Sequence, residues 1–180
     1  MIAAAIFLTG CATTPAPKPV DDWALKLSPA SLGATLQQSQ HLTMTYNGQS
    51  TELDGLIEVT PTQIQVALIK FGRRILTLRY DGTRLDETKD VMVPAEVNGA
   101  RILSDLQLVY WPRASIIAQL PSGYELLEKD MRPVDGPLVR ILLHNKQTIA
   151  TVDYGNPRNQ KAPITLNNAQ FNYIMTIAPQ

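Results

Sequence analysis

Apolar and polar residues alternate along two blocks of the chain, and this alternation predicts a mainly β protein. A period of two residues is typical of strands that bury one face. Turn sequences such as Asn47-Gly48 and Asp81-Gly82 separate the expected strands, as in an antiparallel sheet of hairpins. The pattern predicts about eight strands, over residues 40–46, 53–59, 64–68, 74–80, 124–131, 138–145, 148–154 and 171–177.

Between the two blocks the period changes to that of a helix. Apolar residues recur at helical spacing through residues 95–110, and Trp111-Pro112 ends this helix because proline clashes with the preceding turn. A second short helix is expected over 114–120, and a further one is compatible with 31–38. The order of elements predicts an α+β, mainly β fold. Its expected form is a curved antiparallel sheet or incomplete β-barrel, with a short helical lid across the concave face.

The N-terminus predicts export and lipid anchoring. An apolar run from Ile2 ends in Leu8-Thr9-Gly10-Cys11, which resembles the lipobox of bacterial lipoproteins. The resemblance implies a signal peptide over residues 1–10 and acylation of Cys11, because a thiol forms a stable thioether to diacylglycerol. The alternative is a short buried helix with a chance cysteine. No Lys or Arg precedes the apolar run, where a signal peptide normally carries one.

This interpretation divides the chain into three parts. The signal peptide is followed by the acylated cysteine and a Pro-rich tether over residues 11–22, and then by a single β domain over residues 23–180. Ala12 stands where an Asp marks inner-membrane retention in enteric bacteria. The lipoprotein resemblance therefore implies attachment to the outer membrane, with the domain on the periplasmic face.

Composition narrows the classes of function. The chain carries 16 basic and 16 acidic residues, and this neutral balance argues against a nucleic-acid partner. It has no nucleophile-elbow, phosphate-loop or zinc-protease motif, so no enzyme activity, cofactor or metal is expected. His41 and His144 are expected at the surface or rim. Asp105, beside Ser104, is expected to be a lid residue that bonds to nearby backbone.

Several longer motifs resemble one family of bacterial lipoproteins. They are Leu78-Arg79-Tyr80-Asp81-Gly82, Ile102-Leu103-Ser104-Asp105-Leu106-Gln107-Leu108, Trp111-Pro112 and the Tyr-rich C-terminal end. Members of this uncharacterised family are often encoded beside enzymes of aryl-polyene lipid biosynthesis. Their layout is similar to that of LolB, the outer-membrane receptor that takes lipoproteins from the periplasmic carrier LolA. The resemblance implies an incomplete barrel with a helical lid over an acyl-chain cavity, and a LolA-like carrier as a partner.

The candidate site residues form two groups. The first is an apolar cavity between the lid and the sheet; the alternative for the same residues is a filled core. The second is a membrane-contact turn, in which one aromatic ring lies among three positive charges; the alternative is an ordinary turn with solvated charges. The cavity candidates are Ile64, Val66, Leu68, Leu76, Leu78, Tyr80, Ile102, Leu103, Leu106, Val109, Tyr110, Trp111, Ile141, Leu143, Tyr173 and Met175, and the turn candidates are Lys70, Phe71, Gly72, Arg73 and Arg74.

Together these features predict an outer-membrane-anchored periplasmic lipoprotein that binds or transfers a hydrophobic or amphipathic lipid-like ligand. An aryl-polyene lipid and the acyl chains of lipoproteins are the expected ligands. One alternative is a non-catalytic accessory or structural lipoprotein of an envelope export or assembly complex. A second alternative is a lipid hydrolase or transferase, which would need Ser, Asp and His to converge in the cavity.

Replacing the anchoring cysteine tests the lipoprotein interpretation. Cys11→Ser should leave a soluble or uncleaved protein, because a hydroxyl cannot replace the thiol in thioether formation. Cell fractionation with detergent partitioning measures this change. A Ser variant that still enters the outer-membrane fraction like the wild type would contradict the interpretation.

Overall fold

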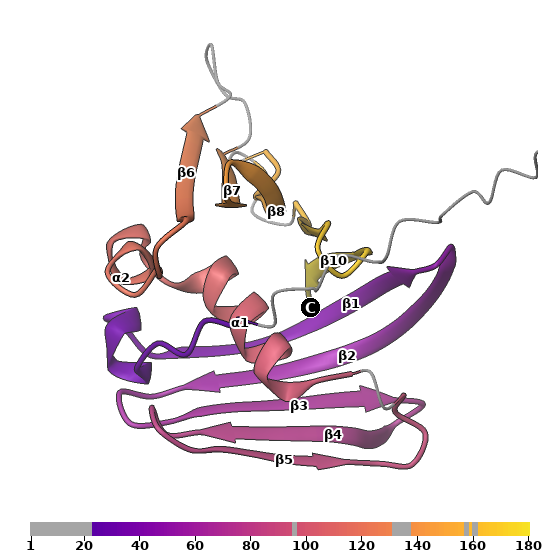
Figure 1. The fold of residues 1–180 in the computed structure, drawn as a ribbon. Coiled ribbons are helices and arrows are strands. Elements are labelled where there is room, and N and C mark those ends of the chain that lie inside the picture. The colour runs from indigo at the N-terminus through magenta and orange to yellow at the C-terminus, as the bar shows by residue number, and fades with distance from the viewer. Residues whose placement is uncertain (1–22, 95–96, 131–137, 157–158, 160–161) are drawn as a thin grey trace, which may run out of the picture.

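One antiparallel sheet curves around a helix without closing into a barrel (Figure 1). The computed structural model describes residues 23–94, 97–130, 138–156, 159 and 162–180; the expected signal peptide, Cys11 and tether lie outside them. Within the described residues the strands follow the order β5-β4-β3-β2-β1-β10-β9-β8-β7-β6. Their bounds are β1 Leu36–Tyr46, β2 Gln49–Val59, β3 Ile64–Lys70, β4 Arg73–Tyr80, β5 Leu85–Lys89, β6 Tyr124–Asp130, β7 Leu138–His144, β8 Gln147–Asp153, β9 Ile164–Asn168 and β10 Tyr173–Pro179.

Three short helices accompany the sheet in the part of the chain that the structure describes. They are the 3-10 helix η1 (Pro29–Leu32) and the α-helices α1 (Gly99–Tyr110) and α2 (Arg113–Ile117). Figure 1 shows α1 crossing the hollow of the curved sheet, between the half formed by β1 to β5 and the half formed by β6 to β8. The structure confirms the predicted mainly β fold with a helical lid on an incomplete barrel.

The ten strands include two that the alternation does not predict. β5 reads Leu85-Asp-Glu-Thr-Lys89 and is exposed at nearly every position, and β9 ends in Asn167-Asn168. Neither sequence has an apolar face of the length that a period of two requires. Both strands form because a neighbour offers a free edge: β5 pairs with β4, and β9 fills the place between β10 and β8.

The first helical predictions are displaced. Residues 36–38 belong to β1 rather than to a helix over 31–38, and only η1 is helical in that region of the described chain. The long helix is predicted from residue 95, but residues 95–96 lie outside the described residues. It begins at Gly99, because the Asn98 side chain caps it by accepting a hydrogen bond from the Ala100 amide at 2.8 Å. Trp111-Pro112 ends the helix as predicted.

Opposite charges hold the two ends of α1. At the N-terminus, the Glu87 carboxylate of β5 accepts the Gly99 amide at 3.1 Å. At the C-terminus, Arg140 of β7 donates to the Leu108 and Trp111 carbonyls and forms an ion pair with Glu128 at 2.7 Å. A carboxylate at the positive end of the helix dipole and a guanidinium at the negative end both stabilise the helix. These contacts fix the lid to both halves of the sheet.

The segment before η1 holds the side of α1. Gln107 is fully buried; its amide oxygen accepts the Leu27 amide and its nitrogen donates to the Leu27 carbonyl, both at 2.8 Å. Ser104 accepts the Leu25 amide at 3.0 Å. Leu25 and Leu27 are themselves almost completely buried, so this extended segment is part of the core.

Removing the cation at the C-terminus of α1 tests this arrangement. Arg140→Leu should lower the free energy of unfolding by about 3 kcal/mol, because it leaves Glu128 and two helix carbonyls without their partner. Arg84→Leu is the matched control: it breaks the exposed Arg84–Asp86 pair and should change stability little. Denaturant unfolding midpoints measure both effects. Equal midpoints for the two variants would show that Arg140 does not hold the lid.

Candidate functional site

A cavity of about 450 Å³ lies between α1 and the concave face of the sheet. Its walls follow the period of two, since they use alternate residues of each strand, all on the side that faces the helix. The strand residues are Gln40, Leu42, Met44 and Tyr46 of β1, Gln49, Thr51, Leu53, Gly55 and Ile57 of β2, Val66 and Leu68 of β3, and Tyr173, Met175 and Ile177 of β10. The helix contributes Arg101, Ile102, Asp105, Leu106, Val109 and Tyr110, and Pro94, Val97, Asn98 and Phe171 complete the lining.

The cavity opens at one end. Lining residues near the β1–β2 turn and before α1 are exposed, among them Tyr46, Gln49 and Pro94. Lining residues toward the C-terminus of α1, such as Ile57 and Val109, are buried. The cavity therefore has a mouth beside the β1–β2 turn and a blind end under the last turn of α1.

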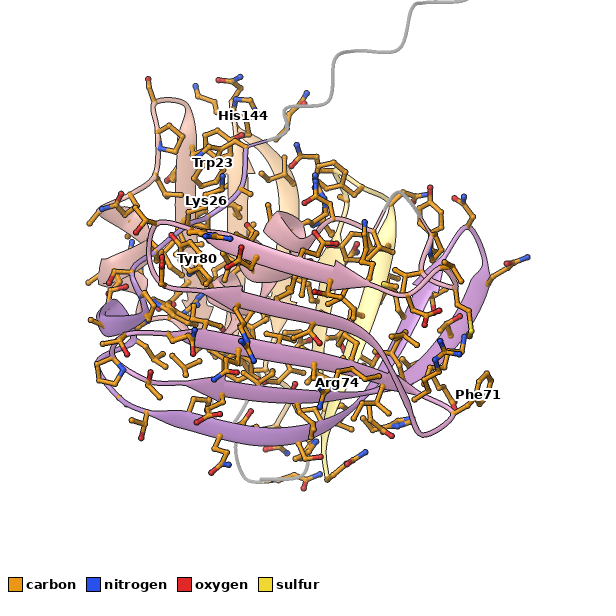
Figure 2. The ribbon with its side chains drawn as sticks, turned by 90° about the horizontal axis from the view of Figure 1, so that it is seen from below. Trp23, Lys26, Phe71, Arg74, Tyr80 and His144 are labelled. Carbon is orange, nitrogen blue, oxygen red and sulfur yellow. The ribbon has the colours of Figure 1, made fainter. Side chains whose placement is uncertain are left out.

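Several predicted cavity residues line this cavity, and others are filled core. Those in the wall are Val66, Leu68, Ile102, Leu106, Val109, Tyr110, Tyr173 and Met175. The remaining concave or lid candidates are packed against each other in the core: Ile64, Leu76, Leu78, Tyr80, Leu103 and Trp111. Tyr80, for example, donates its hydroxyl to the Lys26 and Gly82 carbonyls (Figure 2).

Two candidates, Ile141 and Leu143, are misplaced by the prediction. Both lie on β7, whose buried residues are Arg140 and Leu142, so their side chains are on the opposite face of the strand. β7 is apolar at almost every position, and a period of two cannot then identify the inner face. The inner face of β7 is the one that carries Arg140, because this side chain reaches the carbonyls at the end of α1.

The prediction omits the β1 and β2 walls, although the signal is in the sequence. Leu42, Met44 and Tyr46 alternate on one side of β1, and Leu53 and Ile57 do so on β2. Gly55 widens the cavity between them, and a Cβ there would come within 3.0 Å of the Leu42 side chain. Pairing of β1 with β10 brings Met44 opposite Met175 and Leu42 opposite Ile177, which local sequence cannot show.

Asp105 places a carboxylate in the cavity wall. It accepts hydrogen bonds from the Tyr173 hydroxyl and from Asn168 Nδ2, the latter at 3.3 Å. The expected bonds to nearby backbone are thus replaced by bonds to side chains of β9 and β10. Burial raises the pKa of Asp105 to about 6, while the two hydrogen bonds and the Arg101 charge lower it. Burial and the Asp105 charge also raise the pKa of Tyr173.

The predicted membrane-contact turn is a two-residue hairpin loop. Lys70 pairs with Arg73, and both Phe71 and Gly72 have positive φ, at 53° and 71°. Phe71 is 89% exposed, and its ring points away from the body of the protein (Figure 2). The Lys70 ammonium lies 5.5 Å from the centre of this ring. A bulky residue rarely adopts positive φ, so the turn carries backbone strain without burying its side chain.

Other exposed apolar residues lie at the same end of the sheet. Val91 and Met92 follow β5 and are 99% and 54% exposed. They lie beside the hairpin tip, because Asp90 forms an ion pair with Arg73 and its amide donates to the Ile75 carbonyl. Together with Phe71 and the half-exposed Tyr46, which lines the cavity, they form an apolar rim at the end of the sheet where the cavity opens.

The two histidines of the chain lie outside the cavity lining. His41 pairs with Asp54 across β1 and β2, and His144 stacks on Tyr124 with ring centroids 4.3 Å apart; neither histidine lines the cavity. Among the described residues, no three His, Cys, Asp or Glu side chains are placed to hold a metal ion. No helix in the described part of the chain has the length and apolar character needed to cross a membrane.

Comparisons with known proteins identify the family. A search of curated proteins found no match. A family model matches residues 19–180, a range that includes every described residue. The chain belongs to this family, which is described as protein of unknown function DUF3261.

Proposed function

We propose that the protein is an outer-membrane-anchored periplasmic lipoprotein that binds or transfers a hydrophobic or amphipathic lipid-like molecule. The observation that carries the proposal is the open apolar cavity beneath α1. Its volume lies within the range of roughly 300–1,000 Å³ that is typical of ligand pockets. Apolar side chains from four strands and the helix form most of its wall, with few polar groups among them.

The rim supports contact with a membrane. Exposed Phe71, Val91 and Met92 lie at the same end of the sheet as the mouth, and the Lys70 ammonium lies 5.5 Å from the centre of the Phe71 ring, whereas Arg73 pairs with Asp90 and Arg74 lies away from Phe71 (Figure 2). Apolar tips that enter the interface while cations meet phosphates are typical of interfacial binding. Phe71 adopts a strained positive φ although its side chain is not packed against the domain. This combination favours a role for the ring in contacts outside the domain. A mouth on the membrane would let a ligand pass without crossing water.

Two ligands fit the family resemblance: an aryl-polyene lipid and the acyl chains of lipoproteins delivered by a LolA-like carrier. The accessory-protein alternative requires no ligand, and its filled core is at odds with the open cavity. The hydrolase or transferase alternative requires a histidine near the ligand, whereas His41 and His144 lie away from the cavity.

Filling the cavity tests ligand binding. Leu106→Trp should weaken binding of the neutral fluorophore N-phenylnaphthylamine by about tenfold or more, equivalent to about 1.4 kcal/mol, because the indole takes up ligand space. Ile174→Trp is the matched control: Ile174 lies next to two lining residues on β10 but is exposed on the other face. Fluorescence titration measures the affinities. A natively folded wild type that takes up no apolar probe would favour the accessory-protein alternative.

Changing the hairpin tip separates delivery from storage. Burying Phe71 in a membrane interface contributes on the order of 2 kcal/mol, a partitioning change of roughly thirtyfold. Phe71→Glu should therefore reduce transfer of the bound fluorophore to anionic liposomes, with uptake and melting temperature nearly unchanged. Phe71→Asn should act in the same direction without added charge, since Asn tolerates positive φ.

A control for the tip is Leu56→Glu, which changes another exposed apolar residue, on the outer face of β2. This variant should transfer ligand like the wild type. If the Phe71 and Leu56 variants behave alike, the tip is an ordinary turn and delivery uses another surface.

A further inference from the structure

The cavity wall contains an acid whose hydrogen-bonding capacity is only partly used. Asp105 receives one hydrogen bond at each carboxylate oxygen, from Tyr173 and from Asn168. A carboxylate offers about four acceptor positions. Asp105 is 7% exposed and lines the cavity, so a ligand in the cavity can approach a carboxylate that has little contact with bulk water. A buried carboxylate with spare acceptor capacity is costly unless another donor completes its shell.

The charges of Arg101 and Asp105 limit which ligand group can donate a hydrogen bond to Asp105. Among the described residues, the charged side chains in the lining are Arg101 and Asp105, and they lie four residues apart on α1, which places them on one face. The Arg101 charge lowers the pKa of Asp105, so its field already reaches the carboxylate. A second cation beside this pair would be repelled by Arg101, and an anion would be repelled by Asp105. A neutral hydroxyl or amide N–H is repelled by neither residue.

The position of Asp105 along the cavity indicates which part of the ligand it meets. Asp105 lies one helical turn inside Arg101, and Arg101 is nearer the N-terminus of α1 and the mouth. Leu106 and Val109 lie further toward the blind end. The donor group would therefore belong to the buried body of the ligand rather than to a headgroup that remains in solvent.

We propose that Asp105 is the recognition site for a neutral hydrogen-bond donor, a hydroxyl or an amide N–H, on an otherwise apolar ligand. This inference rests on the proposed function and narrows it, because a plain hydrocarbon chain leaves the site unused. The competing account is that Asp105 serves only to attach α1 to β9 and β10 through Asn168 and Tyr173.

A matched pair of small ligands tests the proposal. Decanol and methyl nonyl ether have the same number of heavy atoms, but only decanol donates a hydrogen bond. Each competes with N-phenylnaphthylamine for the mature domain at pH 8, above the pKa of Asp105 at about 6. Decanol should bind about tenfold more tightly than the ether, since a hydrogen bond to a charged group has a net value of that order.

Variants assign the preference to the carboxylate. Asp105→Asn keeps the shape but replaces one acceptor oxygen with a donor, so the preference for decanol should fall to nearly none. Asn168→Ala removes a partner of Asp105 from outside the cavity lining. It should reduce stability and leave the preference in place.

Three results would overturn the proposal: equal affinities in the wild type, a preference that survives in Asp105→Asn, or binding of the fluorophore that neither compound displaces. The wild-type comparison decides the matter even if Asp105→Asn fails to fold. Failure of the proposed function looks different, because the fluorophore itself would then not bind.

Discussion

The structure depends on how α1 is held inside a sheet that does not close. Glu87 of β5 meets the N-terminus of the helix, and Arg140 of β7 meets its C-terminus. These strands lie near the two free edges of the sheet, so one helix joins both halves through charges that match its dipole. Gln107 and the segment around Leu27 hold the third side. The fourth side faces the concave surface and leaves the cavity.

Attachment on three sides explains why core and cavity coexist beneath one lid. Leu76, Leu78 and Tyr80 of β4 belong to the filled core, whereas alternate residues of β1, β2 and β10 line the cavity. A sheet wider than its helix leaves apolar surface uncovered, and such surface is retained where a ligand or partner covers it. The apolar rim extends this surface to the outside of the molecule.

The period of two was sufficient to predict the curved sheet and its hairpins. It also identified wall residues that share the inner face, such as Val66, Leu68 and Met175. It could not find β5 and β9, whose polar sequences become strands only beside existing edges. Separating wall from core required the position of α1, which depends on long-range contacts such as that of Arg140 with the helix end. The partners of Asp105 are 63 and 68 residues away along the chain, beyond any local pattern.

A cavity that holds a lipid-like molecule in the cell should keep that molecule when the protein is purified. Native mass spectrometry of the protein purified from its own host tests this directly, with lipid analysis of the released ligand. We expect an apolar compound bound at about one per chain, carrying a hydroxyl or amide N–H, and absent from Leu106→Trp. A natively folded protein that arrives without any ligand, in wild type and variant alike, would contradict the account.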